Sequence, residues 1–352
     1  MKRFVGGMVP LSLAVLVVLV VLVMAGRALV AAQTEEAEGV EHALQKPLAE
    51  KSLLLDGAQA GTLLVAVGER GHILHSNDQG QTWQQAESVP TRETLTAVFL
   101  HDEQLGWAVG HDATVLRTRD GAKNWELLYS APEEELPLLD VWFRDADNGF
   151  VVGAYGYFLA TSDGGDSWSS VDLAASDGDG DGDLEEDPYA YEDIADFHLN
   201  HVARSDNGRL YIAAEAGTAY RSDDEGISWT SLPSPYEGSF FSSLPLGGDS
   251  LLLFGLRGHL FRSDDAGETW EEIDSGTQAI LTDGIRLDDG AIVITGLEGS
   301  LLVSRDGGRT FFLKPQADRQ GYSSVLPLPE GGIILFGELG TTILEASRLE
   351  AG

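Results

Sequence analysis

The residues with the most obvious chemical potential form a run of acids and glycines at positions 177–187. Acids at alternate positions followed by Gly182 match the first part of a calcium loop, in which hard oxygens surround Ca²⁺ in a tight turn. Pro188 occupies the place where a helix–loop–helix site has its bidentate Glu, so the pattern favours a short calcium loop. The predicted ligands are Asp177, Asp179, Asp181, Asp183 through its backbone carbonyl, and Glu185.

The same run also fits a solvated linker. Clustered like charges repel one another, and segments rich in Asp and Gly bury too little apolar surface to order themselves. The sequence leaves both interpretations open, with Ca²⁺ as the only candidate cofactor.

Other catalytic or metal chemistry has little support. The chain lacks cysteine, which excludes disulfides, thiol nucleophiles and thiolate metal sites. The eight histidines form no metal-ligating set; His72 and His75, for example, are expected on opposite faces of one strand. A glycosidase needs two carboxylates about 5–10 Å apart, and 57 acidic residues offer many arbitrary pairs. No catalytic residue is predicted.

The elements that would position any site come from a repeat. Six segments read Ser/Thr-x-Asp-x-x-x-x-aromatic, from Ser76–Trp83 to Ser304–Phe311, at intervals of 41 to 43 residues with one longer interval of 61. This repeat is an Asp-box. Its aspartates are Asp78, Asp120, Asp163, Asp224, Asp265 and Asp306. Their side chains are expected to hold a sharp turn by bonding nearby backbone amides, with the aromatic residue packed between modules.

Each box follows two short strands rich in β-branched and aromatic residues, such as 64–68 and 72–75. Four strands in a module of about 42 residues are typical of one propeller blade. A seventh module, at 333–345, lacks its box. The sequence therefore predicts an all-β, seven-bladed β-propeller of four-stranded antiparallel blades. Residues 42–48 are expected to close the ring by supplying the outer strand of blade 7.

The domain prediction starts from the N-terminus. Residues 1–32 combine Lys2 and Arg3 with an apolar stretch, which indicates either a signal peptide cleaved at about Ala32 or a membrane anchor formed by residues 4–25. By the positive-inside rule the remainder is exported, to the periplasm or the outer face of the cytoplasmic membrane. Residues 33–40 are an acidic tether, 41–349 the propeller, and 177–196 an insertion between blades 3 and 4.

The formal net charge of −35 limits the partners. Such a surface repels nucleic acid and anionic lipid headgroups, so neither is an expected partner. The charge suits a soluble monomer in a salty habitat, or an acidic face that attracts a cationic partner or Ca²⁺.

Two blades carry a more specific resemblance. One stretch runs from Val141-Trp142-Phe143 through Asp147-Asn148-Gly149 to Trp168, and a second blade runs from Leu105-Gly106-Trp107 to Trp125. Both resemble the photosystem II stability/assembly factor family. The resemblance covers nearly the whole mature chain and implies a non-enzymatic assembly or stability factor for a membrane protein complex. Related propellers also occur in bacteria without any photosystem. The implied client is therefore a membrane protein or membrane protein complex, which could be a photosystem-like complex or a transporter.

Binding in that family is linked to an arginine-rich patch. The residues here that could contribute to such a patch are Arg117, Arg119, Arg144, Arg257 and Arg262.

Asp-boxes also occur in sialidases, so carbohydrate binding or hydrolysis is the alternative. A sialidase would need an arginine triad and a Tyr/Glu pair, and its early Arg-Ile-Pro motif is absent. A scaffold predicts no convergent acid pair in the central channel, whereas a glycan-binding propeller predicts exposed aromatic residues and acids there.

The calcium loop yields the first testable prediction. If residues 177–187 bind Ca²⁺, calorimetry with millimolar Ca²⁺ should show binding heat and a higher melting temperature, because a ligand that binds only the folded state stabilises it. Neither heat nor a shift is expected from a solvated linker.

Overall fold

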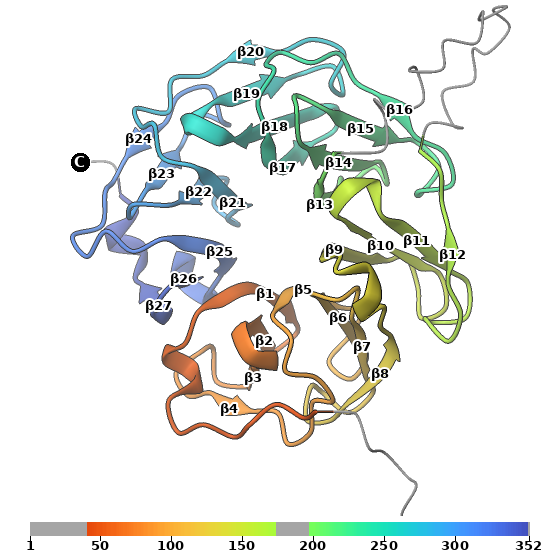
Figure 1. Ribbon diagram of the computed structural model, residues 1–352. Coiled ribbons are helices and arrows are strands. Elements are labelled where there is room, and N and C mark those ends of the chain that lie inside the picture. Colours follow the sequence, from red (N-terminus) through yellow and green to blue (C-terminus); the bar gives the residue numbers. More distant parts are fainter. Residues whose placement is uncertain (1–40, 174–196, 351–352) are drawn as a thin grey trace, which may run out of the picture. The chain divides into compact units, whose positions relative to one another are not determined.

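The computed structural model describes residues 41–173 and 197–350, and these form seven antiparallel sheets arranged as blades around a central channel (Figure 1). The predicted seven-bladed β-propeller is confirmed. Residues 1–40, 174–196 and the final two positions lie outside the described part, and so do the predicted signal or anchor, tether and insertion. The described residues contain no helix with the length and hydrophobicity that a membrane crossing requires.

The first three blades run in chain order with the innermost strand first. They consist of β1 (Leu54–Ala60), β2 (Leu63–Gly68), β3 (Ile73–Ser76) and β4 (Gln84–Gln85); β5 (Leu95–Leu100), β6 (Gly106–Gly110), β7 (Val115–Thr118) and β8 (Trp125–Tyr129); and β9 (Leu138–Phe143), β10 (Gly149–Gly153), β11 (Phe158–Thr161) and β12 (Ser169–Ser170).

Blades 4 to 6 repeat this plan, and blade 7 has three strands. They consist of β13 (Leu199–Arg204), β14 (Leu210–Ala214), β15 (Ala219–Ser222) and β16 (Thr230–Ser231); β17 (Phe240–Gly247), β18 (Ser250–Gly255), β19 (Leu260–Ser263) and β20 (Glu271–Glu272); β21 (Leu281–Arg286), β22 (Ile292–Gly296), β23 (Leu301–Ser304) and β24 (Phe312–Leu313); and β25 (Tyr322–Pro327), β26 (Ile333–Gly337) and β27 (Gly340–Leu344).

Short 3₁₀ turns lie before the first strand, between some of the strands and after the last strand. They are η1 (Ala49–Lys51), η2 (Glu69–Gly71), η3 (Pro132–Glu134), η4 (Ala154–Gly156), η6 (Leu256–Gly258), η7 (Pro329–Gly331) and η8 (Ala346–Arg348).

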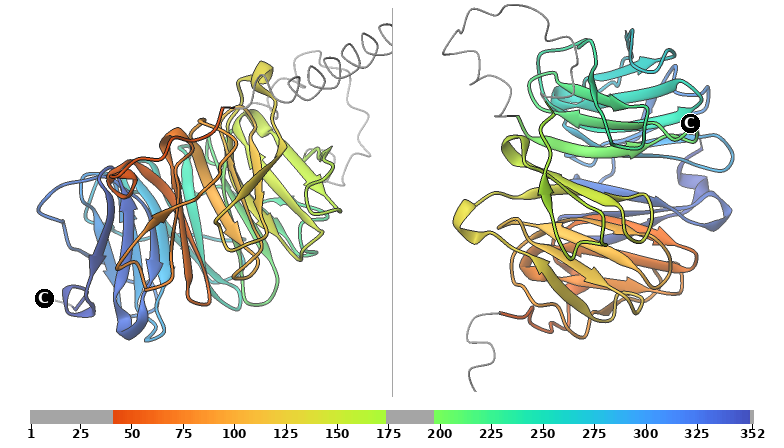
Figure 2. Two further views of the ribbon diagram at one scale, coloured as in Figure 1. Left: turned by 90° about the horizontal axis from the view of Figure 1, so that it is seen from below. Right: turned by 90° about the vertical axis from the view of Figure 1, so that its right-hand side faces the viewer.

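The alternation of antiparallel strands defines two faces of the propeller, seen edge-on in Figure 2. The turns from first to second strand and from third to fourth strand lie on one face, which we call the Asp-box face because it carries the six boxes. The turns from second to third strand, including η2, η4 and η6, lie on the opposite face.

The core lies between blades rather than inside one central mass. Each cluster of buried side chains combines residues from two neighbouring blades. The Asp-box aromatics pack into these clusters; Trp125 and Trp229, for example, lie in the clusters between blades 1 and 2 and between blades 3 and 4. Burial of this apolar surface is the main stabilising contribution to the ring.

The predicted closure by residues 42–48 is wrong. The Ala43 N–H donates to the Val89 carbonyl at 2.9 Å, and the Gln45 amide donates to the Ala86 carbonyl, so this segment follows the outer edge of blade 1. Among residues 41–173 and 197–350, blade 7 has three strands. The prediction required four strands in every blade, but side-chain packing and a hydrogen bond from Ser323 to the Leu54 carbonyl join blade 7 to blade 1.

The closing contact joins blade 7 to blade 1. The Phe336 side chain is fully buried in a cluster with Leu54 and Leu74 of blade 1. A Cβ atom on Gly57 would lie 2.4 Å from the Phe336 ring, so the absence of a side chain at Gly57 permits this close approach.

This contact predicts a large effect of one truncation. Phe336→Ala should lower the free energy of unfolding by about 3–5 kcal/mol, because it leaves a cavity at the closing interface. Phe312→Ala is the matched control, since the Phe312 side chain is 55% exposed on β24, and its effect should stay within about 0.5 kcal/mol. Chemical denaturation of both variants measures the difference; equal losses would contradict closure by packing.

Candidate functional site at the central channel

The channel is lined by the innermost strands and encloses a cavity of about 740 Å³. Each innermost strand contains a β-bulge near its beginning, where one extra residue shifts the register with the second strand. Bulges re-aim nearby side chains. The residues that follow the bulges in blades 1 to 7 are Asp56, Ala97, Asp140, His201, Ser242, Asp283 and Ser324.

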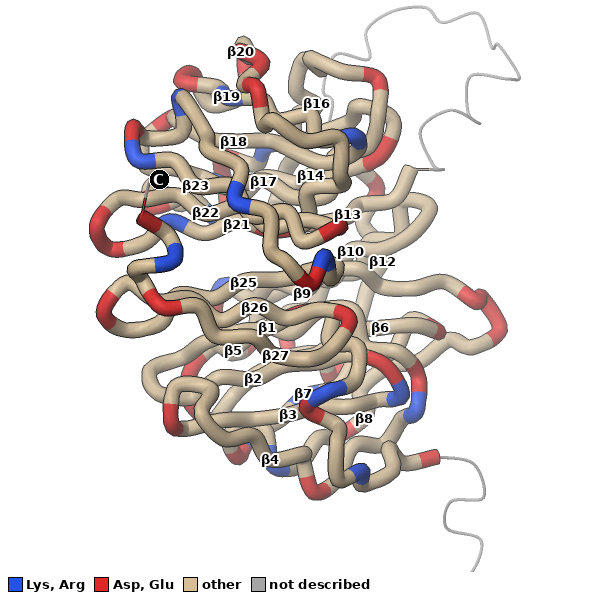
Figure 3. The backbone as a smooth tube through the Cα atoms, turned by 90° about the vertical axis from the view of Figure 1, so that its left-hand side faces the viewer, with Lys and Arg blue, Asp and Glu red and all other residues tan. Residues whose placement is uncertain are grey.

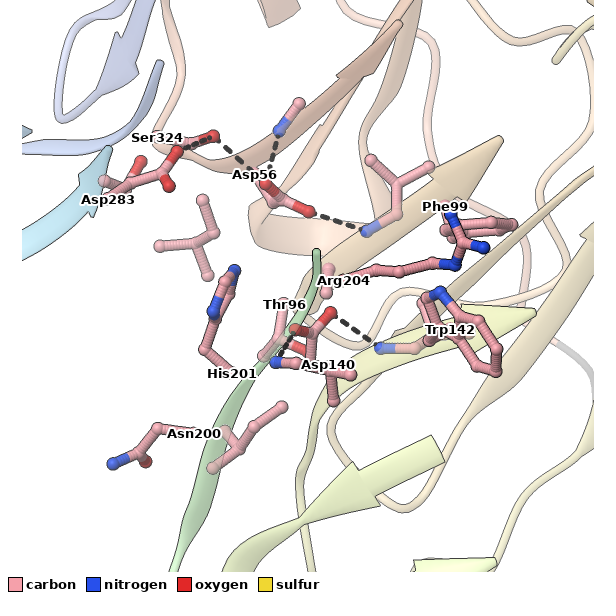
Figure 4. A pocket seen from close by; sticks show the side chains of 18 of the residues that line it. Asp56, Thr96, Phe99, Asp140, Trp142, Asn200, His201, Arg204, Asp283 and Ser324 are labelled. Carbon is pink, nitrogen blue, oxygen red and sulfur yellow. Dashed lines mark hydrogen bonds between the residues drawn. The ribbon is translucent and has the colours of Figure 1, made fainter. Parts of the chain in front are cut away.

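Three of these residues are aspartates that bond to the next blade (Figure 4). One carboxylate oxygen of each accepts the N–H of the residue that follows it, and the other accepts a backbone N–H from the next innermost strand. The inter-blade bonds are Val98 N–H to Asp56 at 2.9 Å, Val202 N–H to Asp140 at 2.6 Å and Val325 N–H to Asp283 at 2.9 Å.

The bulge residues themselves make a second set of inter-blade bonds. In four blades their side chains donate to the carbonyl of the first residue in the next innermost strand. These bonds run from Thr96 to Leu138 at 2.6 Å, Asn200 to Phe240 at 2.7 Å, Thr282 to Tyr322 at 2.7 Å and Ser323 to Leu54 at 2.7 Å. Together with the aspartates, they bridge six of the seven blade junctions.

Ser324 connects two of the carboxyl groups. Its hydroxyl lies 2.9 Å from Asp283 Oδ2 and 3.1 Å from Asp56 Oδ1. A serine hydroxyl carries one proton and can donate to only one carboxylate. Both contacts are hydrogen bonds when one of the two carboxyl groups is itself protonated.

The surroundings favour that protonated form. Desolvation raises the pKa of Asp56 to about 8, with further contributions from Asp140 and Asp283. Burial also raises the pKa of Asp140 and of Asp283, while His201 opposes both rises. Asp56, Asp140 and Asp283 line the channel cavity and are partly exposed as whole residues.

The channel thus contains convergent acids, so the prediction from the scaffold interpretation that it would contain no convergent acid pair is wrong. Asp56 and Asp283 approach one another through Ser324, but their oxygens already accept backbone hydrogen bonds. Carboxyl groups held in this way act as links between blades. Sequence reasoning missed them, although Leu-x-Asp at 54–56, 138–140 and 281–283 recurs in phase with the Asp-boxes.

The end of the cavity toward the Asp-box face has a different character. Arg144 and Arg204 line it together with Phe99 and Trp142. Figure 4 labels Arg204, Phe99 and Trp142. The Nη1 atom of Arg144 lies 3.7 Å from Oε2 of Glu225, and its Nε atom lies 3.2 Å from Oδ2 of Asp145. The guanidinium of Arg204 is exposed and has no hydrogen-bond or ion-pair partner in the described part of the chain.

The five arginines predicted for partner binding do not form one patch. Arg119 and Arg144 lie on turns of the Asp-box face, whereas Arg257 lies on η6 on the opposite face. The side chains of Arg117 and Arg262 are only 6% and 7% exposed. Their inclusion in a partner surface is therefore corrected. Arg204 was missed because the prediction favoured arginines close to the repeat motifs.

The buried arginines are bonded to the next blade. Arg117 donates to the Gly164 carbonyl at 2.9 Å, and Arg262 donates to the Gly307 carbonyl. Arg221 makes the equivalent bond to Ala266 at 2.9 Å. Each acceptor directly follows an Asp-box aspartate, so these arginines join neighbouring blades near the Asp-box face.

The six Asp-box aspartates share one turn geometry. At Asp163, Thr161 Oγ1 donates to Oδ1 at 2.8 Å, while the Ser167 N–H and hydroxyl donate at 2.9 and 2.6 Å. The Ser167 hydroxyl bond, followed by its backbone bond and that of Thr161, holds the pKa of Asp163 near 2. These carboxylates are occupied by local hydrogen bonds.

The predicted calcium ligands lie outside the described residues. Within residues 41–173 and 197–350, no group of three or more His, Asp or Glu side chains is arranged to hold a metal ion.

Comparisons with known proteins match the expected resemblance. The family model described as Photosynthesis system II assembly factor YCF48 matches residues 85–176. The Photosystem II assembly protein Ycf48 of Thermosynechococcus vestitus is 28% identical over 106 residues, which span 30% of this chain and 30% of that protein.

Solved structures share the fold over most of the chain. YCF48 bound to D1 peptide superposes with a TM-score of 0.65 at 18% identity, covering 88% of this chain and 97% of that one. YCF48 from Cyanidioschyzon merolae gives 0.64 at 18% identity, over 86% and 97%. A streptogramin B lyase gives 0.65 at 12% identity, over 86% and 96%, so the fold itself also occurs in an enzyme.

The channel carboxyl groups predict a specific pH dependence. Asp56 is protonated in the folded state at neutral pH and ionised in the unfolded chain, so the folded state binds more protons. Stability should therefore fall as the pH rises from the ordinary Asp value of about 4 toward about 8. Asp56→Asn should flatten this decline in melting temperature and lower stability at pH 5, where one backbone N–H loses its acceptor.

The control is Asp147→Asn, because the Asp147 side chain is exposed and has no hydrogen-bond or ion-pair partner among the described residues. It should reproduce the pH profile of the unsubstituted protein. An unchanged slope in Asp56→Asn would show that Asp56 is ionised in the folded protein.

Proposed function

We propose that this protein is a non-enzymatic, exported scaffold that assists the assembly or stability of a membrane protein complex. The support is the similarity over residues 85–176 to an assembly factor family, together with the same ring architecture in YCF48. The client and the compartment are part of the proposal. The chain would act on the outer side of the cytoplasmic membrane, either released after cleavage at about Ala32 or held by residues 4–25.

One observation supports binding most strongly: an unpaired cation lines the cavity of a very acidic protein. Asp and Glu residues occur on many of the turns, and Lys and Arg residues are fewer (Figure 3). The exposed Arg204 guanidinium therefore differs from Arg209 and Arg221, which both have carboxylate partners. A free guanidinium beside aromatic side chains suits a carboxylate on an extended peptide, because its planar donors bond both oxygens.

The channel mouth, formed by Phe99, Trp142, Arg144 and Arg204, would receive one acidic residue or chain end of the client. Glu225 beside Arg144 disfavours a second anion at the same place. The acidic remainder of the surface repels anionic partners over most approaches, so association is directed to this opening.

A carbohydrate-binding function is a second candidate. It is favoured by the three carboxyl groups of the channel and by the aromatic Phe99 and Trp142 at its end. A glycan would need carboxylate oxygens free to accept its hydroxyl protons, whereas those of Asp56, Asp140 and Asp283 bond to the backbone.

The test is recovery of a client from detergent-solubilised membranes by the tagged full-length chain. An integral membrane protein should be recovered in stoichiometric amount, and Arg204→Glu should reduce its recovery at least tenfold by repelling the carboxylate. Arg70→Glu is the charge-matched control, since Arg70 is 72% exposed on the opposite face, and it should retain full recovery.

Equal recovery of the client by Arg204→Glu and Arg70→Glu would show that the channel mouth is not part of the binding site. Empty recovery by the unsubstituted chain, together with retention on a glycan array, would replace the scaffold proposal with the carbohydrate one.

A further inference from the structure

Blade 7 differs from the others at its outer edge. In the other six blades the third strand pairs with a fourth, whereas β26 is the one strand of the described part of the chain that pairs with β27. β27 spans five residues, Gly340–Leu344, and no backbone hydrogen bond joins its outer edge to another described residue. Such an edge presents unpaired N–H and C=O groups, which readily pair with another extended chain.

The equivalent groups in the other blades show what this edge can bind. In five blades, one residue of the third strand lies opposite the end of the second strand and accepts a hydrogen bond through its carbonyl. The donor is a backbone N–H from the segment after the fourth strand, at 2.7 to 2.9 Å. These carbonyls belong to Ile73, Phe158, Ala219, Leu260 and Leu301, with donors Ala86, Val171, Leu232, Ile273 and Lys314. Thr341 of β27 occupies the same position opposite Phe336.

The start of this edge is partly covered. The backbone of Glu50 in η1 lies so close to Gly340 that a Cβ atom there would be 1.8 Å from the Glu50 carbonyl. The next three residues, Thr341, Thr342 and Ile343, are partly exposed. The accessible ladder is therefore short, comparable with the two-residue strands that complete most other blades.

We propose that the outer edge of β27 is a docking strand for an extended, positively charged segment of another protein, which would become the fourth strand of blade 7. Main-chain bonds supply affinity in this mode of recognition, and alternate side chains supply specificity. This proposal does not depend on the channel mouth.

Charge selects the occupant. Glu338 and Glu345 flank β27 and are exposed, so lysine or arginine at either end of the incoming segment would pair with them. The chain's own residues 33–40 contain Glu35, Glu36 and Glu38, which these acids would repel. A second copy would bring the same two glutamates to the interface, so self-association is also disfavoured.

The test uses a fluorescein-labelled peptide of alternating threonine and valine with lysines at both ends, added to the full-length chain. Fluorescence anisotropy should show saturable binding, and the same peptide with glutamates at its ends should bind at least tenfold more weakly. Replacing both flanking acids, Glu338→Lys with Glu345→Lys, should reverse this preference. The Arg204→Glu variant should bind the lysine peptide like the unsubstituted chain, which separates this edge from the channel mouth.

A second variant tests the ladder itself. Thr341→Pro removes an N–H that points away from β26, so it should weaken binding of the lysine peptide at least tenfold while the chain stays folded, since proline is tolerated on edge strands. If Thr341→Pro fails to fold, the double charge reversal still decides. Equal binding of the two peptides by every folded variant would overturn the proposal.

The position of the bound segment can be read directly, because the chain contains no cysteine. A photo-crosslinker attached to Thr342→Cys should label the lysine peptide. Labelling of residues 33–40, or of a second copy in the presence of the peptide, would instead assign the edge to this chain and overturn the proposal.

Discussion

Hydrogen bonds between innermost strands are the constraint on which the rest of the ring depends. In six of the seven blades, a bulge at the start of the innermost strand lets a side chain bond to backbone groups of the next blade that would otherwise lack partners. Asp56, Asp140 and Asp283 accept N–H groups there, and Thr96 and Ser323 donate to carbonyls. Since buried backbone groups left unpaired are costly, these side chains fix both the spacing and the angle between blades.

A second set of bonds holds the blades farther from the channel. Arg117, Arg221 and Arg262 each reach the carbonyl that follows an Asp-box aspartate in the next blade. The Asp-box thus has two roles, because its side chains close a turn while its backbone receives an arginine. The two sites that we propose for binding, the channel mouth near Arg204 and the outer edge of β27, lie outside these two sets of bonds between blades.

Much of the fold could be predicted from the sequence, because the box motif recurs at a blade-sized interval and marks one turn per blade. The closing contact could not, since the pairing of residues 42–48 is decided by the Ala43 backbone N–H and the Gln45 side chain meeting the Val89 and Ala86 carbonyls in three dimensions. The residues of the candidate site at the channel were harder to predict from the sequence than the fold. Arg117 and Arg204 look alike in sequence, and only the placement of Gly164 beside one of them distinguishes a link between blades from an exposed cation.

The three-stranded seventh blade also affects how such a ring can evolve. Because the seam between Phe336 and Leu54 is a side-chain interface with no shared strand, it is the same kind of joint as those between the other blades. Duplication or loss of one repeat would then leave every strand pairing intact and require adjustment only of the curvature. A ring built in this way can change its number of blades by recombination within the gene, without any change in the strand pairing of its first or last blade.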